Sequence, residues 1–303
     1  IIKIKHIKLI LFIIIIMFIA VITRVKNENY MLKSFIPHYL DEGVDKIYLL
    51  NDSSTEPFED WVLNHPKVEI RPLKMRHPEW SEVRICAHSL RNIADWVITV
   101  DCDEFITTRR NKDKTIREEL ETTFKDASCI KVPWAMFTRN GRKEMPNDVV
   151  LGTTWRWSQD IKHSLPNNVH SKKFHDRYDY MEVKCIWKPK HYAGMHVHHP
   201  YKPTDPSYVS VESIDNLPSS IELHSGSIYR GLREEHINRA YLICNHYRIV
   251  SEEHAKMKCN PDSCTLYIDS HEQNVFQNAL NADFPDIEDT LLSEKYEKRR
   301  NNK

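Results

Sequence analysis

A buried segment that runs straight into two carboxylates places the strongest constraint on the fold of this chain. Trp96 to Val100 are apolar or β-branched throughout, and Asp101 and Asp103 follow at once. Such a short, unbroken segment is typical of a strand covered on both faces of a parallel sheet. Ligands of open α/β sheets bind beyond the carboxyl ends of the strands. The segment therefore predicts a covered α/β sheet with two carboxylates at its ligand-binding edge.

Strands and helices alternate before this segment. Short β-branched or alternating stretches predict strands, and apolar residues at helical spacing predict helices. In chain order we expect a strand at 20–25, a helix between Asn29 and Gly43, strands at 46–50 and 68–73, and a helix at 79–94. This order is that of a mostly parallel sheet covered by helices on both faces.

The first of these helices carries local signals at both ends. Asn29 is a favoured residue for capping a helix start, and Gly43 is a common residue just past a helix end. Pro37 lies between them, where its missing N–H is expected to kink the helix or to mark a fresh start. The helix is therefore expected to begin at a capping Asn29 and to stop before Gly43.

Polar residues follow three of the predicted strands. They are Lys26-Asn27-Glu28, Asn51-Asp52, and Asp101 with Asp103. Parallel strands end at the same edge of a sheet, so these separate segments are expected to converge there. A solvated acidic turn is the alternative interpretation of the two aspartates. The buried strand before them and the apolar residues after them favour a functional pair.

The chain lacks the glycine-rich loops that hold phosphate in dinucleotide dehydrogenases and P-loop kinases. It has six glycines, and neither GxGxxG nor GxxxxGK[ST] occurs. A bound phosphate would then need another neutraliser, most simply a metal ion. Asp101 and Asp103 supply hard oxygen ligands, which suit Mn²⁺ or Mg²⁺. Such an ion can stabilise the negative charge of a leaving diphosphate.

Composition narrows the partners that the chain can have. Lys and Arg number 43 and equal Asp and Glu, so no net charge draws the chain to nucleic acid. The seven cysteines have no CxxC spacing, which argues against a zinc ribbon. The length of 303 residues suits one large domain or two small ones. We therefore expect no nucleic-acid partner.

Residues 1–18 form a hydrophobic leader with two interpretations. Leu9 to Ile22 is an unbroken apolar run that follows several lysines, but it is shorter than the roughly 20 residues of a membrane span. Its β-branched end also suits a first strand that stops at a polar loop. A membrane anchor and a strand with a hydrophobic leader both remain open. We expect a membrane-associated protein, with a cytoplasmic one as the alternative.

A series of motifs extends from the first strand to residue 258. Its members are Val25–Glu28, Gly43–Tyr48, Asp52–Ser54, Ala94–Val97, Asp101–Phe105, Ile130–Phe137, Lys184–Pro189 and Asn245–Arg248. In this order they resemble the family-2-like and family-92 glycosyltransferases. The resemblance implies a GT-A-like α/β fold, a nucleoside-diphosphate sugar as donor, and a divalent cation.

The resemblance also implies a domain plan. Residues 19–270 would form one GT-A glycosyltransferase domain, with a nucleotide-sugar half at 19–110 and an acceptor half at 111–270. The acceptor half is expected to add an α+β extension to the mostly parallel sheet. Residues 271–303 are rich in charge and are expected to form a helix or tail.

Site residues follow by position from the same resemblance. The donor would be bound by Lys26, Asn27, Glu28, Asp52, Asp101, Lys184 and Lys188, of which the last two would neutralise phosphate. Asp101, Asp103 and His246 would hold Mn²⁺ or Mg²⁺, and Asp103 would be essential to catalysis. The implied reaction moves a sugar, expected to be a hexose, from a UDP-linked donor to a glycan or other hydroxyl acceptor with inversion.

An inverting transfer needs a general base that takes the proton of the acceptor hydroxyl. Candidates after the metal motif are Asp160, Asp176, Asp179 and Glu182. We choose Asp160, because the preceding Trp155-Arg156-Trp157 segment would offer aromatic rings to a sugar. Core packing is the alternative role of these tryptophans.

Four histidines between His191 and His199 support a different class of function. A His-x-His pair on a strand can bind zinc when both rings point the same way. This arrangement predicts a metal-dependent hydrolase as the alternative function. No carboxylate accompanies the histidines at fixed spacing. We therefore prefer the interpretation that one ring faces the acceptor while the others pack or are exposed.

Overall fold

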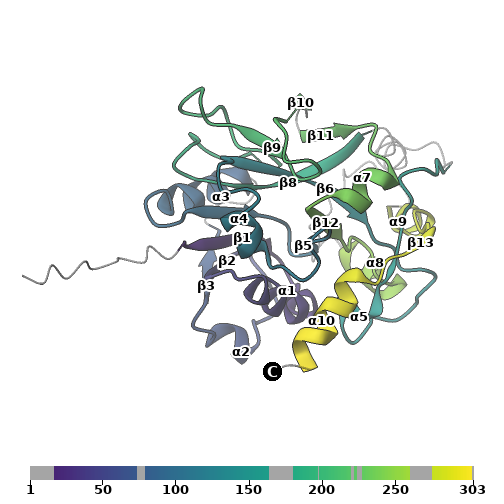
Figure 1. The fold of residues 1–303 in the computed structure, drawn as a ribbon. Coiled ribbons are helices and arrows are strands. Elements are labelled where there is room, and N and C mark those ends of the chain that lie inside the picture. The colour runs from purple at the N-terminus through teal and green to yellow at the C-terminus, as the bar shows by residue number, and fades with distance from the viewer. Residues whose placement is uncertain are drawn as a thin grey trace, which may run out of the picture.

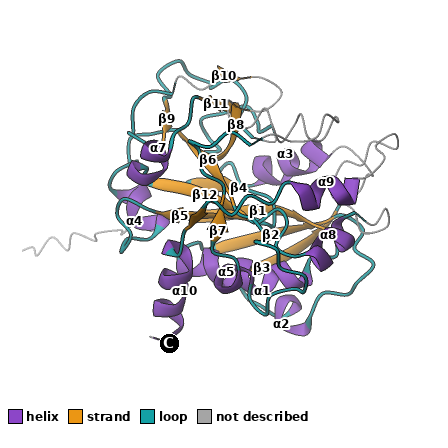
Figure 2. Cartoon of the chain, turned by 90° about the vertical axis from the view of Figure 1, so that its right-hand side faces the viewer, coloured by secondary structure: helices purple, strands orange, loops and turns teal. Residues whose placement is uncertain are grey.

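A mixed β-sheet forms the centre of the protein and has helices on both faces (Figure 1, Figure 2). The computed structural model describes residues 17–73, 79–163, 180–196, 198–219, 222–223, 227–259 and 275–301 of the 303-residue chain. Within these residues the sheet has eleven strands, and its main path runs β3-β2-β1-β4-β8-β6-β12-β5. The predicted α/β fold, a GT-A-like sheet covered by helices, is confirmed.

One half of the sheet is entirely parallel. It contains β1 (Ile19–Val25), β2 (Lys46–Asn51), β3 (Val68–Pro72) and β4 (Trp96–Thr99). Strand β1 lies between β2 and β4, and β3 pairs with the outer side of β2. All four strands occur where β-branched and apolar residues predict them, to within a residue or two. Their carboxyl ends therefore meet at one edge of the sheet.

The other half of the sheet mixes both strand directions. β8 (Tyr180–Trp187) runs antiparallel to its neighbours β4 and β6 (Cys129–Met136). β12 (Leu242–His246) is parallel to β6 and antiparallel to β5 (Glu104–Thr108). The remaining strands of this sheet are β9 (Ser210–Glu212), β10 (Glu222–Leu223) and β11 (Ser227–Arg230). This mixed half adds strands of both directions to the parallel half.

Alternating side chains of the central strand β1 build a core on each face. Ile19 and Val21 belong to the core that includes α1 (Asn29–Asp41). Ala20 and Ile22 point the other way and pack in the core that includes α3 (Glu79–Ser89). All four β1 residues are fully buried. Burial on both faces explains why the strand reads as a continuous apolar run.

The first helix differs from its prediction at the start. Helix α1 begins at Asn29, so Glu28 occupies the cap position, and its side chain makes no capping hydrogen bond in the described structure. The Asn29 amide instead donates to the carbonyl of Pro57 at 2.8 Å. The helix continues through Pro37 to Asp41. Gly43 follows with φ +91°, which confirms its predicted place just past the helix end.

A short turn carries the chain from one half of the sheet to the other. Strand β4 ends at Thr99 beside β1, whereas β5 begins at Glu104 and pairs with β12 at the far end of the sheet path. The backbone N–H of Glu104 donates to the carbonyl of Asp101 at 3.0 Å, which closes the turn. Asp101 and Asp103 therefore lie where the sheet changes neighbours, the position at which α/β sheets bind ligands.

Small elements cover the rest of the sheet. They are α2 (Asp60–Leu63), α4 (Ile116–Glu121), α5 (Val149–Gly152), β7 (Trp155–Arg156), α7 (Glu234–Arg239), α8 (Glu252–Lys258), α9 (Val275–Asn281) and β13 (Ile287–Glu288). β7 and β13 pair as a separate two-stranded sheet. The second predicted helix, expected at 79–94, ends earlier as α3, and its last residues form turns instead.

The C-terminal segment is docked onto the fold. Helix α10 (Leu291–Asn301) buries Leu292 and Tyr296 and packs beside α5 (Figure 1). Lys295 and Arg299 on this helix form ion pairs of 2.6 and 2.9 Å with the buried carboxylate of Glu42, which follows α1. The charge that made residues 271–303 look like a helix or tail thus serves in part to attach the helix.

The N-terminal apolar run contributes a strand where the structure describes it. Ile19 to Val25 form β1 at the centre of the sheet, as the β-branched end of the run predicts. Residues 1–16, which hold most of the predicted leader, lie outside the described residues. Among the described residues, none of the helices combines the length and the apolar character that a membrane span requires.

Candidate active site

The polar residues that follow four strands meet at one edge of the sheet. The N–H of Asp52, just after β2, donates to the carbonyl of Val25 at the end of β1 at 2.9 Å. The N–H of Tyr247, just after β12, donates to the carbonyl of Asp103 at 2.8 Å. The predicted convergence of separate segments is thus present. Seven side chains, which we call the carboxylate–lysine cluster, gather here: Glu28, Asp101, Asp103, Glu104, Lys184, His246 and Lys258.

Lys184 joins two carboxylates at the exposed side of the cluster. Its ammonium lies 2.8 Å from Asp101 Oδ2 and 3.2 Å from Glu104 Oε2. Glu104 Oε2 also accepts the backbone N–H of Asp101 at 2.7 Å. Lys184 and Glu104 are fully buried, whereas half of the Asp101 side chain is exposed. Asp101 is therefore the member of the cluster that an incoming ligand can reach first.

Lys258 and His246 flank the second aspartate of the turn. The ammonium of Lys258 forms an ion pair with Asp103 Oδ2, and Nε2 of His246 lies 3.5 Å from Asp103 Oδ1. All three side chains are less than a tenth exposed. The sequence resemblance predicts His246 at the site, and the structure brings it beside Asp103.

Lys258 is the last residue of helix α8, and contacts along this helix hold its backbone in place. The Ser251 hydroxyl caps this helix by accepting the N–H of His254 at 2.9 Å. The His254 ring accepts the N–H of Val250 through Nδ1 and lies 2.5 Å from the Tyr30 hydroxyl through Nε2. Because Tyr30 belongs to α1, these contacts fix α8 against the helix that follows the first strand.

The two aspartates are ionised and the two lysines are charged. Burial alone would raise the pKa of each aspartate, but Lys184 holds the pKa of Asp101 low, and Lys258 with His246 holds that of Asp103 well below its usual range. Burial would lower the pKa of both lysines, yet the neighbouring carboxylates raise it. The cluster therefore holds two ion pairs that offset the cost of burying their charges.

The two glutamates of the cluster behave differently. Burial raises the pKa of Glu28 to about 8, and Lys258 only partly offsets this effect. Burial likewise raises the pKa of Glu104 well above its usual range, against the influence of Lys184. Glu28 is therefore largely neutral near pH 7 in this conformation. Neighbouring carboxyl groups whose pKa values are shifted in opposite directions are common at catalytic sites.

The donor atoms of the cluster suit a divalent cation. His246 is neutral, because burial lowers its pKa despite Asp103, and its buried Nδ1 has no hydrogen-bond partner among the described residues. Ligands that share a small cation lie roughly 3 Å apart, since each bond is about 2.1 Å long. The 3.5 Å between Asp103 and His246 is close to this separation.

Both carboxylates are nevertheless paired with lysines. Across the described residues, no group of three or more His, Cys, Asp or Glu side chains is placed to hold a metal ion. Asp101 is held by Lys184, and Asp103 is held by Lys258. The residues thus fit a divalent cation by their chemistry, and binding one requires the carboxylates to exchange a lysine for the ion.

Two residues expected to bind the nucleotide, Asp52 and Asn27, have partners within the protein. Asp52 pairs with both the Nε and a terminal nitrogen of Arg24. Asn27, at φ +53°, accepts the N–H groups of Thr55 and Glu56 through Oδ1 at 2.8 and 3.0 Å. Asn27 thus shapes the loop after β2.

The predicted phosphate ligand Lys188 lies elsewhere. It follows the end of β8 that pairs with the start of β4, so it is at the opposite end of the sheet from Asp101. Its ammonium donates to the carbonyl of Lys125 at 3.0 Å and lies over the Trp96 ring. Lys26 remains at the site edge, directly after β1, and is half-buried.

Asp160, the predicted base, is not a member of the carboxylate–lysine cluster. Asp160 is exposed, and its Oδ1 accepts the N–H of Glu234 at the start of α7 at 3.4 Å. Trp157, which precedes it, is buried and packs on Phe284, so core packing is the role that the structure gives this tryptophan. Of the other candidates, Asp176 and Asp179 lie outside the described residues, and Glu182 lies on β8.

The histidines of the 191–199 segment separate in the fold. His191 bonds to the Ser128 hydroxyl at 2.8 Å, just before β6 begins. His198 is buried against the carbonyl of Val183 at 2.9 Å, nearer the site edge. The rings of His196 and His199 stack with centroids 5.0 Å apart. Their different partners give no support to a shared zinc site.

The sequence matches one known family over most of its length. The profile of glycosyltransferase family 92 covers residues 19–275, from the first strand to the start of α9. The chain belongs to glycosyltransferase family 92. The match includes every member of the carboxylate–lysine cluster, and it confirms the resemblance noted for the motifs. No curated protein matches this family 92 chain significantly.

Solved structures resemble this family 92 protein only distantly. HddC from Yersinia pseudotuberculosis has 10% identity and a TM-score of 0.32, and covers 74% of this chain and 98% of its own. Mannosyltransferase PcManGT from Pyrobaculum calidifontis, in complex with GDP-Man and Mn²⁺, has 12% identity and a TM-score of 0.30. That likeness covers 38% of this chain, which spans 34% of the mannosyltransferase. At such scores neither likeness carries an argument.

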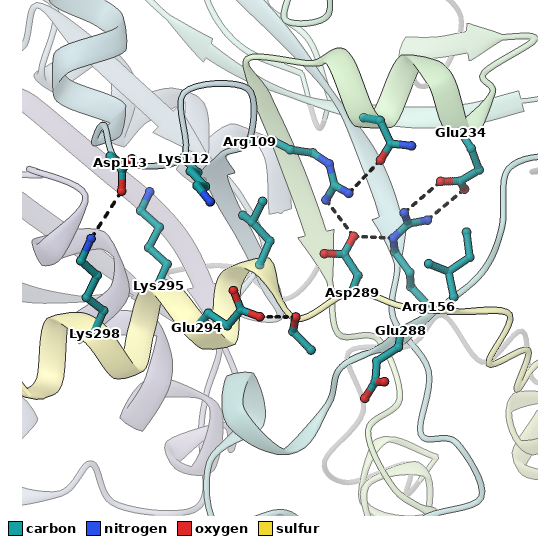
Figure 3. Close-up of a pocket in the computed structure, with 14 residues that line it drawn as sticks. Arg109, Lys112, Asp113, Arg156, Glu234, Glu288, Asp289, Glu294, Lys295 and Lys298 are labelled. Carbon is teal, nitrogen blue, oxygen red and sulfur yellow. Dashed lines mark hydrogen bonds and ion pairs between the residues drawn. The ribbon is translucent and has the colours of Figure 1, made fainter.

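A separate pocket of about 540 Å³ lies near the C-terminal helix (Figure 3). Its charged side chains mainly bind one another: Asp289 contacts Arg109 and Arg156 at 2.7 Å each, and Arg156 contacts Glu234 at 2.9 Å. Arg109 follows the end of β5 that lies away from Glu104. This network attaches the C-terminal segment, and we place the site at the carboxylate–lysine cluster instead.

Three residues at the site edge have no role in the sequence prediction. Glu104 and Arg24 are charged residues within otherwise buried strands, which is a signal that could have identified them. Lys258 lies 155 residues from Asp103 along the chain, and nothing in its local sequence points to the site. Only the fold brings it there.

Proposed function

We propose that this family 92 glycosyltransferase moves a hexose from a UDP-linked donor to a glycan or other hydroxyl acceptor, with a divalent cation and with inversion. The observation that carries the proposal is the carboxylate–lysine cluster at the edge where β1, β2, β4 and β12 end. This edge combines carboxylates that suit a cation with ammonium groups that suit phosphate.

The reaction itself needs charge control at the departing group. The acceptor hydroxyl gives its proton to the general base, and its oxygen attacks the anomeric carbon. The bond from that carbon to the diphosphate breaks, and its electron pair leaves with the diphosphate. A divalent ion held by Asp101, Asp103 and His246 would neutralise that charge. Lys184, which is buried beside Asp101, would donate charge-assisted hydrogen bonds to a phosphate oxygen.

The nucleotide is assigned to the side of the site formed by the loops after β1 and β2. Lys26, Glu28 and Asp52 lie there, and Arg24 orients Asp52. Asn27 acts by holding the loop at Thr55 and Glu56. Lys188 is left out of this proposal, because it lies at the other end of the sheet.

Asp160 remains the proposed general base. An isolated bridge joins Phe137 to Arg156, and the N–H of Phe137 donates to the carbonyl of His246 at 3.0 Å. These contacts bring the segment before Asp160 to the site side of the sheet. Its carboxylate is exposed, as a base that meets an acceptor must be.

A donor screen tests the proposal directly. The purified chain is incubated with UDP-, GDP- and dTDP-linked hexoses and Mn²⁺, and release of the nucleoside diphosphate is measured with and without an acceptor mixture. We expect turnover of a UDP-linked hexose that excess EDTA abolishes. Turnover that persists in EDTA contradicts the metal requirement, and turnover of none of the donors contradicts the proposed reaction.

A thermal shift separates this function from the hydrolase alternative. UDP with Mn²⁺ should raise the melting temperature of a glycosyltransferase, since ligands that bind the folded state stabilise it. A hydrolase that uses the histidines near residues 191–199 predicts no such shift. Those histidines contact different partners in the fold, which does not support a shared metal site for a hydrolase.

A further inference from the structure

Lys258 forms an ion pair with Asp103, the carboxylate to which a divalent cation is expected to bind. Its ammonium pairs with Asp103 Oδ2, while the other oxygen of the same carboxylate faces His246. Among the described residues, Asp103 is the carboxylate with which this ammonium forms an ion pair. A cation at Asp103 and His246 would therefore meet a like charge within a few ångströms.

We propose that Lys258 is an exchangeable counterion of the donor site. It neutralises Asp103 while no metal is bound, and it transfers its ammonium to the donor diphosphate when a divalent cation takes Asp103. The proposal rests on the proposed function, because it needs both a divalent cation and a diphosphate at this edge. It gives Lys258 a role in coupling metal binding to donor binding.

The charges of the site balance in both states. Without ligands, Asp101 and Asp103 are offset by Lys184 and Lys258. A divalent cation would offset the same two carboxylates and so release both ammonium groups. A diphosphate joined at each end to ribose and sugar carries one negative charge on each phosphate. The two released lysines match it, so the two aspartates, the two lysines, the cation and the diphosphate together carry no net charge.

The position of Lys258 allows its side chain to move while its backbone stays in place. Lys258 is the last residue of α8, and the cap by Ser251 and the contact of His254 with Tyr30 fix that helix. A lysine has a flexible four-carbon stem with a compact charge at its end. The ammonium can therefore change partners without rearrangement of the helix.

Chemical labelling of the wild-type chain tests the exchange without any mutation. Acetic anhydride acetylates accessible lysines, and mass spectrometry measures the extent at Lys258 in three states. We expect slow labelling without metal, faster labelling with Mn²⁺ alone, and slow labelling again with Mn²⁺ and UDP. Lys256, which is exposed on the same helix and pairs with Glu252, serves as the internal control and should be labelled in all three states.

The labelling has two outcomes that overturn the proposal. Equal protection of Lys258 with and without saturating Mn²⁺ shows that the ammonium does not leave Asp103. Continued fast labelling with Mn²⁺ and UDP, at concentrations where UDP binds, shows that it does not move to the diphosphate. GDP replaces UDP as the probe if only GDP binds the wild-type chain.

Substitution of Lys258 provides a second test, because it should change the affinities for Mn²⁺ and for UDP in opposite directions. Lys258→Met removes the competing charge, so Mn²⁺ measured alone by electron paramagnetic resonance should bind about tenfold more tightly. The same variant should bind UDP about tenfold more weakly in saturating Mn²⁺, because a charge-assisted phosphate contact is lost. Lys256→Met removes an equal charge two residues away and should change neither affinity.

These measurements distinguish failure of the inference from failure of the proposed function. A wild-type chain that binds neither Mn²⁺ nor either nucleotide refutes the proposed function, and the inference with it. A wild-type chain that binds both, with no gain of Mn²⁺ affinity in Lys258→Met, refutes the role of Lys258 alone. The labelling result on wild type decides the matter if the variant does not fold.

Discussion

The carboxylate of Asp289 is predicted to anchor the C-terminal segment. It receives hydrogen bonds from Arg109 and Arg156 at 2.7 Å each, and its side chain is 6% exposed (Figure 3). Asp289→Ala removes a shared partner from two guanidinium groups, one of which is fully buried. Breaking a buried pair in this way typically costs about 3–5 kcal/mol. The free energy of unfolding, measured by urea denaturation, should fall by about that amount.

An exposed aspartate at the same pocket provides the matched control. Asp113 pairs with Lys298 at 3.4 Å, and both side chains are more than 70% exposed. Asp113→Ala should leave the free energy of unfolding unchanged within error, because water screens such a pair. A loss below about 1 kcal/mol in Asp289→Ala would refute the reasoning. The segment beyond residue 275, where the family match ends, would then not be held through this network.

Three further predictions concern the site. Asp52→Ala should raise the donor KM more than it lowers kcat, and Arg24→Met should act in the same direction because Arg24 orients Asp52; an unchanged KM in both would contradict this. Folded Glu28 keeps its proton up to about pH 8, against an ordinary pKa of 4.5, so the stability it contributes is full below pH 4.5 and is lost as pH rises toward 8. Glu28→Gln should therefore flatten the decline of unfolding free energy over this range in EDTA, and a slope equal to that of wild type would refute it. His246→Ala should weaken Mn²⁺ binding about tenfold, and wild-type affinity in a folded variant would remove His246 from the metal site.

Local sequence predicted the parallel half of the sheet well. The strands β1 to β4 are short, β-branched and covered on both faces, so each reads as a strand without reference to the rest of the chain. Their common direction follows from the helices between them, and this places Asp52, Asp101 and Asp103 at one edge. Asn29 does not cap the helix, because α1 already begins at Asn29 and Glu28 occupies the cap position.

Long-range contacts could not be predicted in the same way. Lys258 reaches Asp103 only because β12 and α8 return to the edge after about half of the chain has folded elsewhere. The resemblance assigned Lys188 to the phosphate together with Lys184, which lies four residues before it. Strand β8 runs antiparallel to β4, however, so those four residues carry Lys188 to the other end of the sheet. Strand direction, which no local pattern reveals, decided both cases.

Donor turnover in an Asp103→Ala variant tests the central claim most directly. The account predicts that release of UDP from the donor, in saturating Mn²⁺, falls at least roughly a hundredfold, because the variant loses the charge control of the leaving group. Asp113→Ala should keep wild-type turnover, and circular dichroism should show that both variants are folded. Turnover within a fewfold of wild type in folded Asp103→Ala would contradict the placement of the active site at the carboxylate–lysine cluster.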